Sequence, residues 1–354
     1  MRCYRPYFCS SLWIILLLSV NFPALSQRKM DIKLSPVSGE KIISVTAGGK
    51  PLTSFFYPDS LAKPILFPIY APDGQIITRG FPIAARSDDP TDHPHHTGLW
   101  FNYENVNGLD FWNNSYAIPA EKKSRYGYIH TDSILMTSNG QIGKLAYMAS
   151  WKKQDGEAII REKTAYLFSA IDSFYIIDRI TNLLALDSID FADAKDGCLG
   201  LRVTHLLELP SAQPATYTDE HGVKTTVPAN RKQTTGNYTT SEGKTGDSAW
   251  GTRASWCMLY GKLQQDTIGI VIIDHPSNPG YPTYWHARGY GLFAANPLGQ
   301  KIFSNGKEEL NFRLKKGESA TFRYRILISA GKSRPALASI AKLSSEFASE
   351  RSLP

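Results

Sequence analysis

The amino-acid sequence predicts an all-β protein, a large and mainly antiparallel β-sandwich with one helix near its C-terminal end. Short runs of β-branched and aromatic residues recur along most of the chain, and turn residues separate them at short intervals, as in sandwiches and barrels. Apolar residues at helical spacing appear only near the end of the chain. A jelly-roll sandwich is the alternative arrangement of the same strands.

The expected strands begin early in the chain. Residues 41–46 form a short β-branched run that ends at the turn residues 48–51. The turn composition of 71–74, between apolar runs at 65–70 and 75–78, predicts a β-hairpin. Further strands are expected at residues 133–136, 144–151, 158–168, 173–182, 199–209, 257–260, 267–274, 309–314 and 321–329.

Two segments depart from this strand-and-turn pattern. Ile340 and Phe347 belong to an apolar stripe at helical spacing, which predicts a terminal helix over about 335–349, with Ser333 as a candidate cap. Residues 210–248 are rich in Thr, Gly, Ser and charged residues and hold few large apolar side chains. This composition predicts a long loop excursion, either a lid or a flexible loop.

The N-terminal residues 1–26 have the pattern of a cleaved signal peptide. Two arginines precede an apolar run over 12–20, and small residues follow at 24–26. The apolar run is too short to span a bilayer, and no later stretch is long and apolar enough to do so. We therefore expect export to the periplasm or the cell exterior, with residues 27–354 forming a single sandwich domain.

Charge and cysteine content narrow the function classes. The formal net charge is +7, and it falls to +5 without the two arginines of residues 1–26. The remaining basic residues are scattered, so the sequence predicts no nucleic-acid partner. Cys198 and Cys257 lie outside the signal segment and are candidates for a disulfide, but their spacing does not decide whether they pair. Neither belongs to a CxxC pair, which argues against a zinc–thiolate site.

The first group of candidate site residues is the segment Asp92-His93-Pro94-His95-His96. It holds three of the eight histidines of the chain. If the segment is extended, His93 and His95 point to one side and His96 to the other. The two histidines on one side then form a metal site or hold an anionic group or a sugar, with Asp92 orienting a ring or serving as a third ligand. The alternative is a polar loop whose histidines bind backbone groups, beside a core Trp100.

Arg79 and Asp110 flank this segment. Arg79 is suited to hold a carboxylate or a developing oxyanion. Asp110 lies between Leu109 and Phe111, so its carboxylate needs partners and is either a buried acceptor or a base.

The second group of candidates runs from Asp274 to Arg288. Asp274 and His275 close an apolar strand, so their polar groups should emerge at its end. The loop that follows is rich in proline and glycine, as expected of a fixed loop that aims side chains. In extended geometry Tyr284, His286 and Arg288 share one face.

Aromatic residues accompany these polar groups. Trp250 lies upstream and Trp285 lies beside His286, while Asn296 follows as either a turn residue or a pocket residue. Aromatic faces with scattered polar donors suit sugar rings, whose C–H faces stack while their hydroxyls form hydrogen bonds. The alternative is that these aromatic side chains belong to the core.

Four motifs together resemble one known family. They are DHPHHxGLW at 92–100, NGxDFW at 107–112, DHP at 274–276 and WHxRxYGLFAANP at 285–297. The resemblance covers most of the mature chain and is to exported bacterial proteins commonly labelled "methane oxygenase PmoA". That label is not taken as a function, since the methane monooxygenase subunit that shares it is an integral membrane protein. Family members resemble companions of carbohydrate-degradation systems, which implies sugar chemistry, and the family supplies no established catalytic residues.

A second resemblance concerns the fold. Residues 314–322 are similar to the late hairpin of galactose-mutarotase-like β supersandwiches, with a Gly-Glu turn between two strands. In such proteins histidines and carboxylates on the concave sheet handle sugars, although fold alone does not assign a reaction.

Three functions follow from these candidates. The leading hypothesis is an exported enzyme, a hydrolase, lyase or epimerase, that acts on a glycan or sugar derivative by His/Asp acid–base chemistry and requires no cofactor. Its catalytic candidates are His93, His95, His275, His286, Asp110 and Asp274. Its substrate-binding candidates are Arg79, Arg288, Trp100, Trp250, Trp285, Tyr284 and Asn296. The alternatives are a non-catalytic saccharide-binding protein and a metal-dependent oxygenase or hydrolase whose divalent metal is held by His93, His95 and His286.

Overall fold

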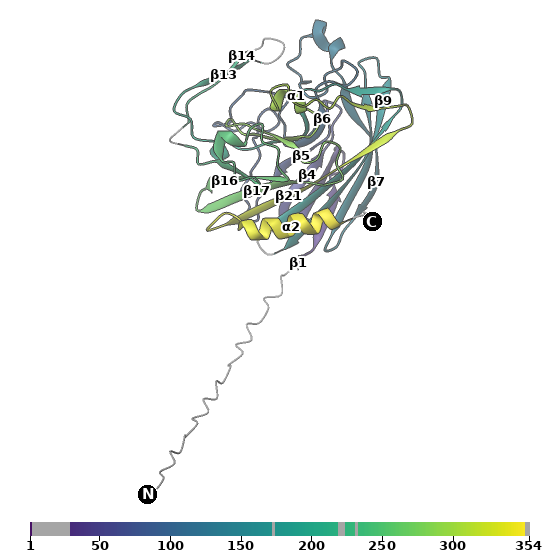
Figure 1. Ribbon diagram of the computed structural model, residues 1–354. Coiled ribbons are helices and arrows are strands. Elements are labelled where there is room, and N and C mark those ends of the chain that lie inside the picture. The colour runs from purple at the N-terminus through teal and green to yellow at the C-terminus, as the bar shows by residue number, and fades with distance from the viewer. Residues whose placement is uncertain (2–28, 172–173, 219–223, 231–232, 351–354) are drawn as a thin grey trace.

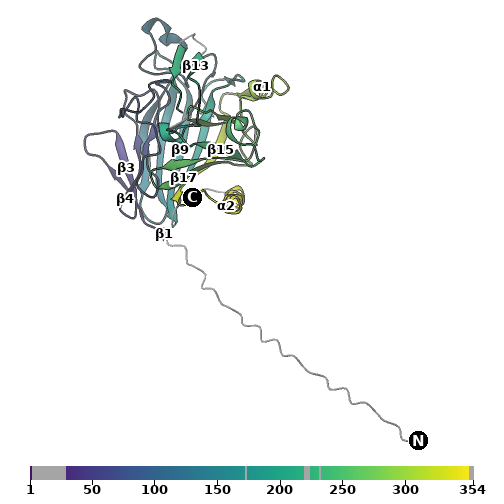
Figure 2. The same cartoon turned by 90° about the vertical axis from the view of Figure 1, so that its left-hand side faces the viewer.

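Two large antiparallel sheets packed face to face form the body of the molecule (Figures 1 and 2). The computed structural model describes Met1 and residues 29–350, apart from 172–173, 219–223 and 231–232. The expected signal peptide therefore lies outside the described residues, except for Met1. Within the described part of the chain, no helix is long and apolar enough to cross a membrane.

One sheet has nine strands and the other has eight. In order, the nine-stranded sheet contains β15 (Asn237–Thr240), β16 (Trp256–Leu263), β17 (Asp266–Asp274), β21 (Ser319–Gly331), β10 (Phe174–Ala185), β9 (Ala158–Ile171), β8 (Gly143–Lys152) and β7 (Tyr128–Ser138), with β1 (Lys29–Met30) beside β9. The eight-stranded sheet contains β18 (Tyr284–Ala287), β19 (Leu292–Asn296), β12 (Gly197–Arg202), β6 (Leu99–Tyr103), β5 (Ile65–Ile69), β4 (Lys50–Phe56), β3 (Ile42–Ala47) and β2 (Ile32–Pro36). This architecture confirms the predicted antiparallel sandwich.

Smaller elements join these sheets. Two-stranded pairs form between β11 (Ile189–Phe191) and β20 (Phe312–Leu314), and between β13 (Ala215–Thr218) and β14 (Lys224–Val227). The helices are α1 (Gln300–Phe303) and α2 (Leu337–Ser349), with 3-10 turns η1 (Ala120–Arg125), η2 (His205–Leu207) and η3 (Gly246–Ala249).

The predicted terminal helix is confirmed as α2. Its buried residues Ile340 and Phe347 pack against Trp256, Val271 and other side chains on the outer face of the nine-stranded sheet. Figure 2 shows α2 on the side of the molecule away from β3 and β4.

The mainly apolar space between the sheets contains a buried polar network around Arg179. Arg179 on β10 donates hydrogen bonds to Glu162 at 2.8 Å and to the hydroxyl of Tyr147 at 3.2 Å. Its guanidinium lies 5.1 Å from the ring centre of Phe101, which belongs to the opposite sheet. The network therefore belongs to the nine-stranded sheet and contacts the opposite sheet through Arg179.

The outer face of the eight-stranded sheet is the floor of the candidate site. Gly200 on β12 pairs with Trp100 on one side and with Ala294 on the other, and Ala294 pairs with His286. Since side chains alternate along strands, these residues share one face, and their neighbours Phe101 and Phe293 point into the core between the sheets. Two small residues thus separate a tryptophan from a histidine.

Several local expectations need correction. The strand expected at 199–209 ends at Arg202, and η2 follows it. Residues 75–78 form isolated bridges rather than a strand. The turn at Gly317 exists, but β20 pairs with β11, so residues 314–322 do not form a hairpin. The strands not anticipated as elements are β1, β2, β4, β6, β11, β13, β14, β15, β18 and β19.

The predicted excursion and the two cysteines can also be placed. Residues 210–248 contain β13, β14, β15 and η3, and β15 joins the edge of the nine-stranded sheet. Cys198 and Cys257 are both free thiols and both buried, so the disulfide that the sequence left open does not form.

Candidate functional site

The histidine segment forms a tight turn above the outer face of the eight-stranded sheet. His93 has a left-handed backbone with φ of 44°, and the amide of His96 donates a hydrogen bond to the His93 carbonyl at 3.0 Å. The three rings gather as a result: His93 lies parallel to His96 at 4.7 Å, and His95 meets His96 edge-on at 4.3 Å. The extended arrangement that would place His96 opposite the others is therefore wrong.

Asp92 is the anchor of this turn. Its two carboxylate oxygens accept hydrogen bonds from the Arg202 guanidinium at 2.8 and 2.9 Å, and Arg79 donates a third at 3.1 Å. Burial alone would raise the pKa of Asp92, but Arg202, His93 and Arg79 together lower it far below its usual range. Asp92 is thus a fixed negative charge.

This carboxylate orients His93. The Nδ1 atom of His93 lies 2.5 Å from the Asp92 Oδ2 atom. Burial lowers the pKa of His93 below its usual value, while the hydrogen bond to Asp92 opposes that shift. A neutral ring that donates from Nδ1 to Asp92 carries its acceptor lone pair on Nε2.

Arg79, a predicted substrate contact, holds the turn in place. It is buried, and it donates hydrogen bonds to the backbone carbonyls of Asp92 at 2.7 Å, His93 at 2.9 Å and His96 at 3.0 Å. The structure therefore gives Arg79 a clear role in shaping the histidine turn.

A second imidazole–carboxylate pair lies on the same face. The Nδ1 atom of His286 is 3.1 Å from Asp196 Oδ1, and the Lys195 ammonium is 3.4 Å from Asp196 Oδ2. Burial would raise the pKa of Asp196, yet His286, Lys195 and His95 lower it below its usual range. His95 and His286 therefore both interact electrostatically with Asp196.

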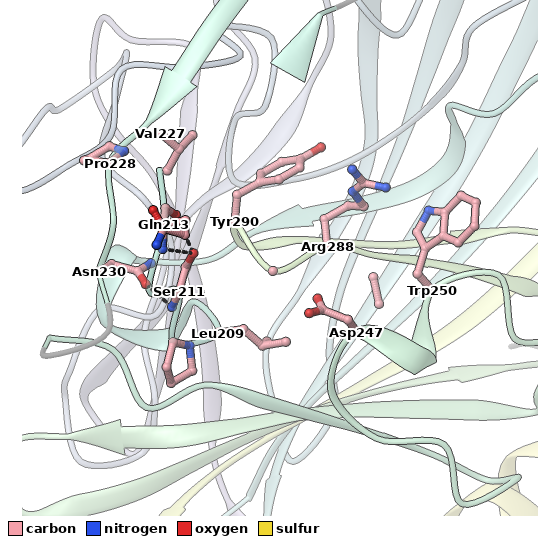
Figure 3. A pocket seen from close by; sticks show the side chains of 13 residues that line it. Leu209, Ser211, Gln213, Val227, Pro228, Asn230, Asp247, Trp250, Arg288 and Tyr290 are labelled. Atoms are coloured by element: carbon pink, nitrogen blue, oxygen red, sulfur yellow. Dashed lines mark hydrogen bonds between the residues drawn. The ribbon is translucent and has the colours of Figure 1, made fainter. Parts of the chain in front are cut away.

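A pocket of about 360 Å³ opens beside this cluster. Tyr290 joins the pocket to the histidine turn, because its ring lines the pocket and stacks parallel on His93 at 4.9 Å. The Arg288 guanidinium lies 5.7 Å from the Tyr290 ring centre and 5.8 Å from that of Trp250 (Figure 3). Two predicted binding residues, Arg288 and Trp250, thus line the same pocket.

The other walls of the pocket come from the excursion. Asp247 projects from η3, and Ser211, Asn230 and Val227 lie across the pocket from it (Figure 3). The Asn230 amide donates to Glu208 at 3.0 Å, and Glu208 lies 3.7 Å from the Arg202 guanidinium. This chain of contacts ties the excursion to the groups that hold Asp92.

Lys63 lies under the histidine turn. Its ammonium donates to the carbonyl of His95 at 2.7 Å and to that of Trp112 at 3.3 Å, above the Trp100 ring. Burial lowers the pKa of Lys63 to about 7, against an opposing contribution from Asp110.

Asp110 itself accepts hydrogen bonds from the backbone and side chain of Asn113, both at 2.9 Å. Trp100 packs beneath His96, with ring centres 5.4 Å apart.

Asp274 and His275 lie outside the histidine cluster. Asp274 accepts hydrogen bonds from the Asn278 side chain at 2.7 Å and the Thr283 amide at 2.8 Å, and burial raises its pKa to about 7. The His275 ring packs edge-on against Phe347 of α2 at 5.0 Å. Asp274 thus holds the loop between β17 and β18, and His275 contacts the helix α2.

Tyr284, Trp285 and Asn296 also make contacts outside the pocket lining. Tyr284 and His286 share a face of β18, as predicted, and both rings pack on Phe303. Trp285 is buried between the sheets and donates to the Ala254 carbonyl at 3.0 Å. The Asn296 side chain bonds the backbone of four neighbouring residues: Ala194, Lys195, Leu298 and Gly299.

Metal ligation was the third hypothesis. Across the residues that the structure describes, no group of three or more His, Cys, Asp or Glu side chains has the arrangement of a metal site. The candidate set His93, His95 and His286 is therefore not such a group.

Sequence comparison places the chain in a family. The model of DUF6807, a family of unknown function, matches residues 42–342. This chain belongs to the DUF6807 family. No protein among the curated ones matches the sequence. The DUF6807 description assigns no activity, so the oxygenase label noted from the motifs gains no support from it.

Solved structures show a distant likeness to this DUF6807 fold. A galactose mutarotase-like protein from Clostridium acetobutylicum is 11% identical, with a TM-score of 0.37 over 86% of this chain and 99% of its own. The α-galactosidase AgaB from Geobacillus stearothermophilus is 11% identical, with a TM-score of 0.38 over 85% of this chain and 41% of its own. An α-galactosidase from Lactobacillus brevis is 10% identical, with a TM-score of 0.35 over 85% and 39%. The chain spans about two fifths of the length of the α-galactosidases that it matches.

Sequence reasoning missed several residues of the site. Arg202 ends an apolar strand, and a charge in that position was the available signal. Tyr290 lies inside one of the four motifs but was not assigned a role, and Asp196 and Asp247 lie in segments without a recognisable pattern. Their importance comes from contacts between segments far apart in the chain.

Proposed function

We propose that this DUF6807 protein is an exported enzyme that acts on a saccharide bound beside Trp250, Arg288 and Tyr290, with the Asp92–His93 pair as acid and base. The parallel stacking of His93 on Tyr290 at 4.9 Å carries the proposal, because Tyr290 also lines the pocket and so joins the Asp92–His93 pair to it. The carbohydrate class rests on the lining of the pocket.

The lining has the composition that sugar recognition requires. Trp250 and Tyr290 provide aromatic faces for the C–H side of a sugar ring. Arg288 provides donors, Asp247 provides acceptors, and Ser211 offers a hydroxyl. A cavity of about 360 Å³ is near the lower end of the usual range for small-molecule sites, which suits one or two sugar units.

The Asp92–His93 pair supplies the proton chemistry. A neutral His93 accepts a proton at Nε2 from a substrate hydroxyl, a C–H group or an attacking water, and Asp92 stabilises the resulting imidazolium without itself being protonated. The low pKa of His93 keeps the ring in its basic form at neutral pH. Hydrolysis, elimination and epimerisation each use such a step.

The test combines binding and turnover across a panel of oligosaccharides. We expect His93→Ala to lose about 10²- to 10⁴-fold in turnover while it still binds saccharide, since acid–base catalysis contributes about that much. Trp250→Ala should weaken saccharide binding. The control His130→Ala removes a partly exposed imidazole on β7 and should leave saccharide binding and turnover unchanged. Unchanged turnover in His93→Ala would refute the assigned base. Binding without any turnover in the natural protein would favour the saccharide-binding alternative.

Export is part of the proposal because of the pattern at residues 1–26. Expression of the full chain in a bacterial host, followed by cell fractionation and N-terminal sequencing, should give a periplasmic or secreted protein that begins near Gln27. An uncut chain in the cytoplasm would contradict this part of the proposal.

A further inference from the structure

We propose that the pocket selects an uncharged sugar unit with two neighbouring hydroxyl groups, which Asp247 and Arg288 bind together. This inference rests on the proposed function and adds the substrate class to it. It depends on the charges of the lining, the position of Asp247 and the fixed position of Arg288.

The lining of the pocket carries balanced charge. Among the described residues that line it, Asp247 is the one carboxylate and Arg288 the one guanidinium, and the others are neutral, as Ser211, Gln213 and Asn230 are. A site for a uronate or a sulfated sugar needs net positive charge to offset the cost of desolvating the anion. The balanced lining instead favours a ligand without charge.

Asp247 lies directly against the strand connection that carries Arg288. A Cβ atom built on Gly289 would come within 3.3 Å of the Asp247 Oδ1 atom. The carboxylate thus approaches the backbone of the residue next to Arg288, where glycine leaves room for it. One ligand can therefore contact both charged groups at the same time (Figure 3).

Arg288 is placed by aromatic rings on two sides. Its guanidinium lies within 6 Å of the ring centres of both Trp250 and Tyr290, at 5.8 and 5.7 Å. A sugar that stacks on Trp250 would present its ring edge to this guanidinium. A carboxylate only accepts hydrogen bonds and a guanidinium only donates them, whereas each hydroxyl does both, so an adjacent pair of hydroxyls satisfies both groups. The carboxylate of a uronate would instead face the negative charge of Asp247.

The experiment compares methyl glycosides of hexoses with those of the matching hexuronic acids, using calorimetry on the full-length folded protein and its variants. We expect at least about 10-fold tighter binding of the neutral glycosides, as the loss of a charge-assisted hydrogen bond would give. Asp247→Asn should weaken the binding of the neutral glycosides about 10-fold. It should also reduce or reverse the preference for neutral glycosides over uronates. Asp247 is exposed on a short 3-10 turn, so the variant should fold.

The matched control is Glu242→Gln, an exposed acidic residue of the same segment that lies outside the pocket lining. This variant should keep the preference of the natural protein for neutral glycosides over uronates. Tighter binding of uronates by the natural protein, or an unchanged preference in Asp247→Asn, would overturn the inference while the proposed sugar chemistry stands. If neither class binds, both the inference and the proposed function fail.

Discussion

Lys63 places its amino group beneath the site, where two backbone carbonyls accept its hydrogen bonds. One of these carbonyls belongs to His95, so Lys63 helps to position the histidine turn from below. Asp92 carries a negative charge and is held from the side by Arg202 and Arg79. The shape of the turn therefore depends on single polar side chains that come from distant parts of the chain.

The pH dependence of stability should reveal the lowered pKa of Lys63. Burial lowers its pKa from 10.5 to about 7, so between these values the unfolded chain holds a proton that the folded chain has lost. The free energy of unfolding should therefore rise with pH in this window, by about 3 kcal/mol between about pH 7 and 9.5. Urea unfolding of the natural protein and Lys63→Met at several pH values measures the difference. Parallel pH profiles would contradict the assignment.

The adjacency of Asp92 and His93 was visible in the sequence, but the groups that make it useful were not. Arg202 reaches Asp92 across a separation of 110 residues, and no local pattern predicts that contact. The extended model of the histidine turn was wrong because Arg79 binds three of its carbonyls and bends the backbone around its guanidinium.

At the scale of elements, β12 controls the floor of the site. Gly200 lies between Trp100 and Ala294, and a Cβ atom there would come within 2.5 Å of the Trp100 ring and 2.8 Å of the Trp112 ring. Glycine is needed because the two indoles fill the space above it. The strand thus supports the histidine turn indirectly, through the tryptophans on which His96 rests.

Gly200→Ala should therefore destabilise the protein by about 2 kcal/mol through overpacking. Gly331→Ala, at the end of β21, is the control because a Cβ atom there meets nothing within 4 Å, and it should change stability by less than about 0.5 kcal/mol. Thermal and urea unfolding of both variants measure these effects. Equal stability of the two variants would show that the indoles can move aside.

Much of the element pattern could be read from the sequence. Most strands of the nine-stranded sheet and α2 appear where the apolar pattern predicts them, whereas β1 and β15 were not predicted. Strands β6, β18 and β19 were missed because they are buried on both faces and lack alternation. The site segments are these same strands and their loops, so the region of the site was found while its strands were not.

At the scale of the whole molecule, the Arg179–Glu162 pair belongs to the nine-stranded sheet and lies in the interface with the other sheet. Both side chains are about 1% exposed, and the guanidinium also contacts Phe101 of the opposite sheet. A buried ion pair of this kind contributes little net stability over an apolar substitute, but the loss of one partner leaves an uncompensated buried charge. The sandwich should therefore be sensitive to single changes here.

Arg179→Met should lower the free energy of unfolding by about 3–5 kcal/mol, since Glu162 would remain buried and charged. Addition of Glu162→Gln should recover part of that loss, because it removes the charge. Lys153→Met disrupts the exposed ion pair with Glu157 and should leave the free energy of unfolding nearly unchanged. A double variant no more stable than Arg179→Met would show that lost hydrogen bonds, rather than the charge, explain the loss.

The pocket draws its walls from both halves of the sandwich. Asp247 and Trp250 lie in the connection between β15 and β16 of one sheet, whereas Arg288 and Tyr290 lie between β18 and β19 of the other. A bound molecule would therefore fasten the two layers to each other, and the folded form would gain about 2.7 kcal/mol at a ligand concentration of about 100 times Kd. A rise in melting temperature can thus identify the natural ligand from a chemical library before any reaction is known.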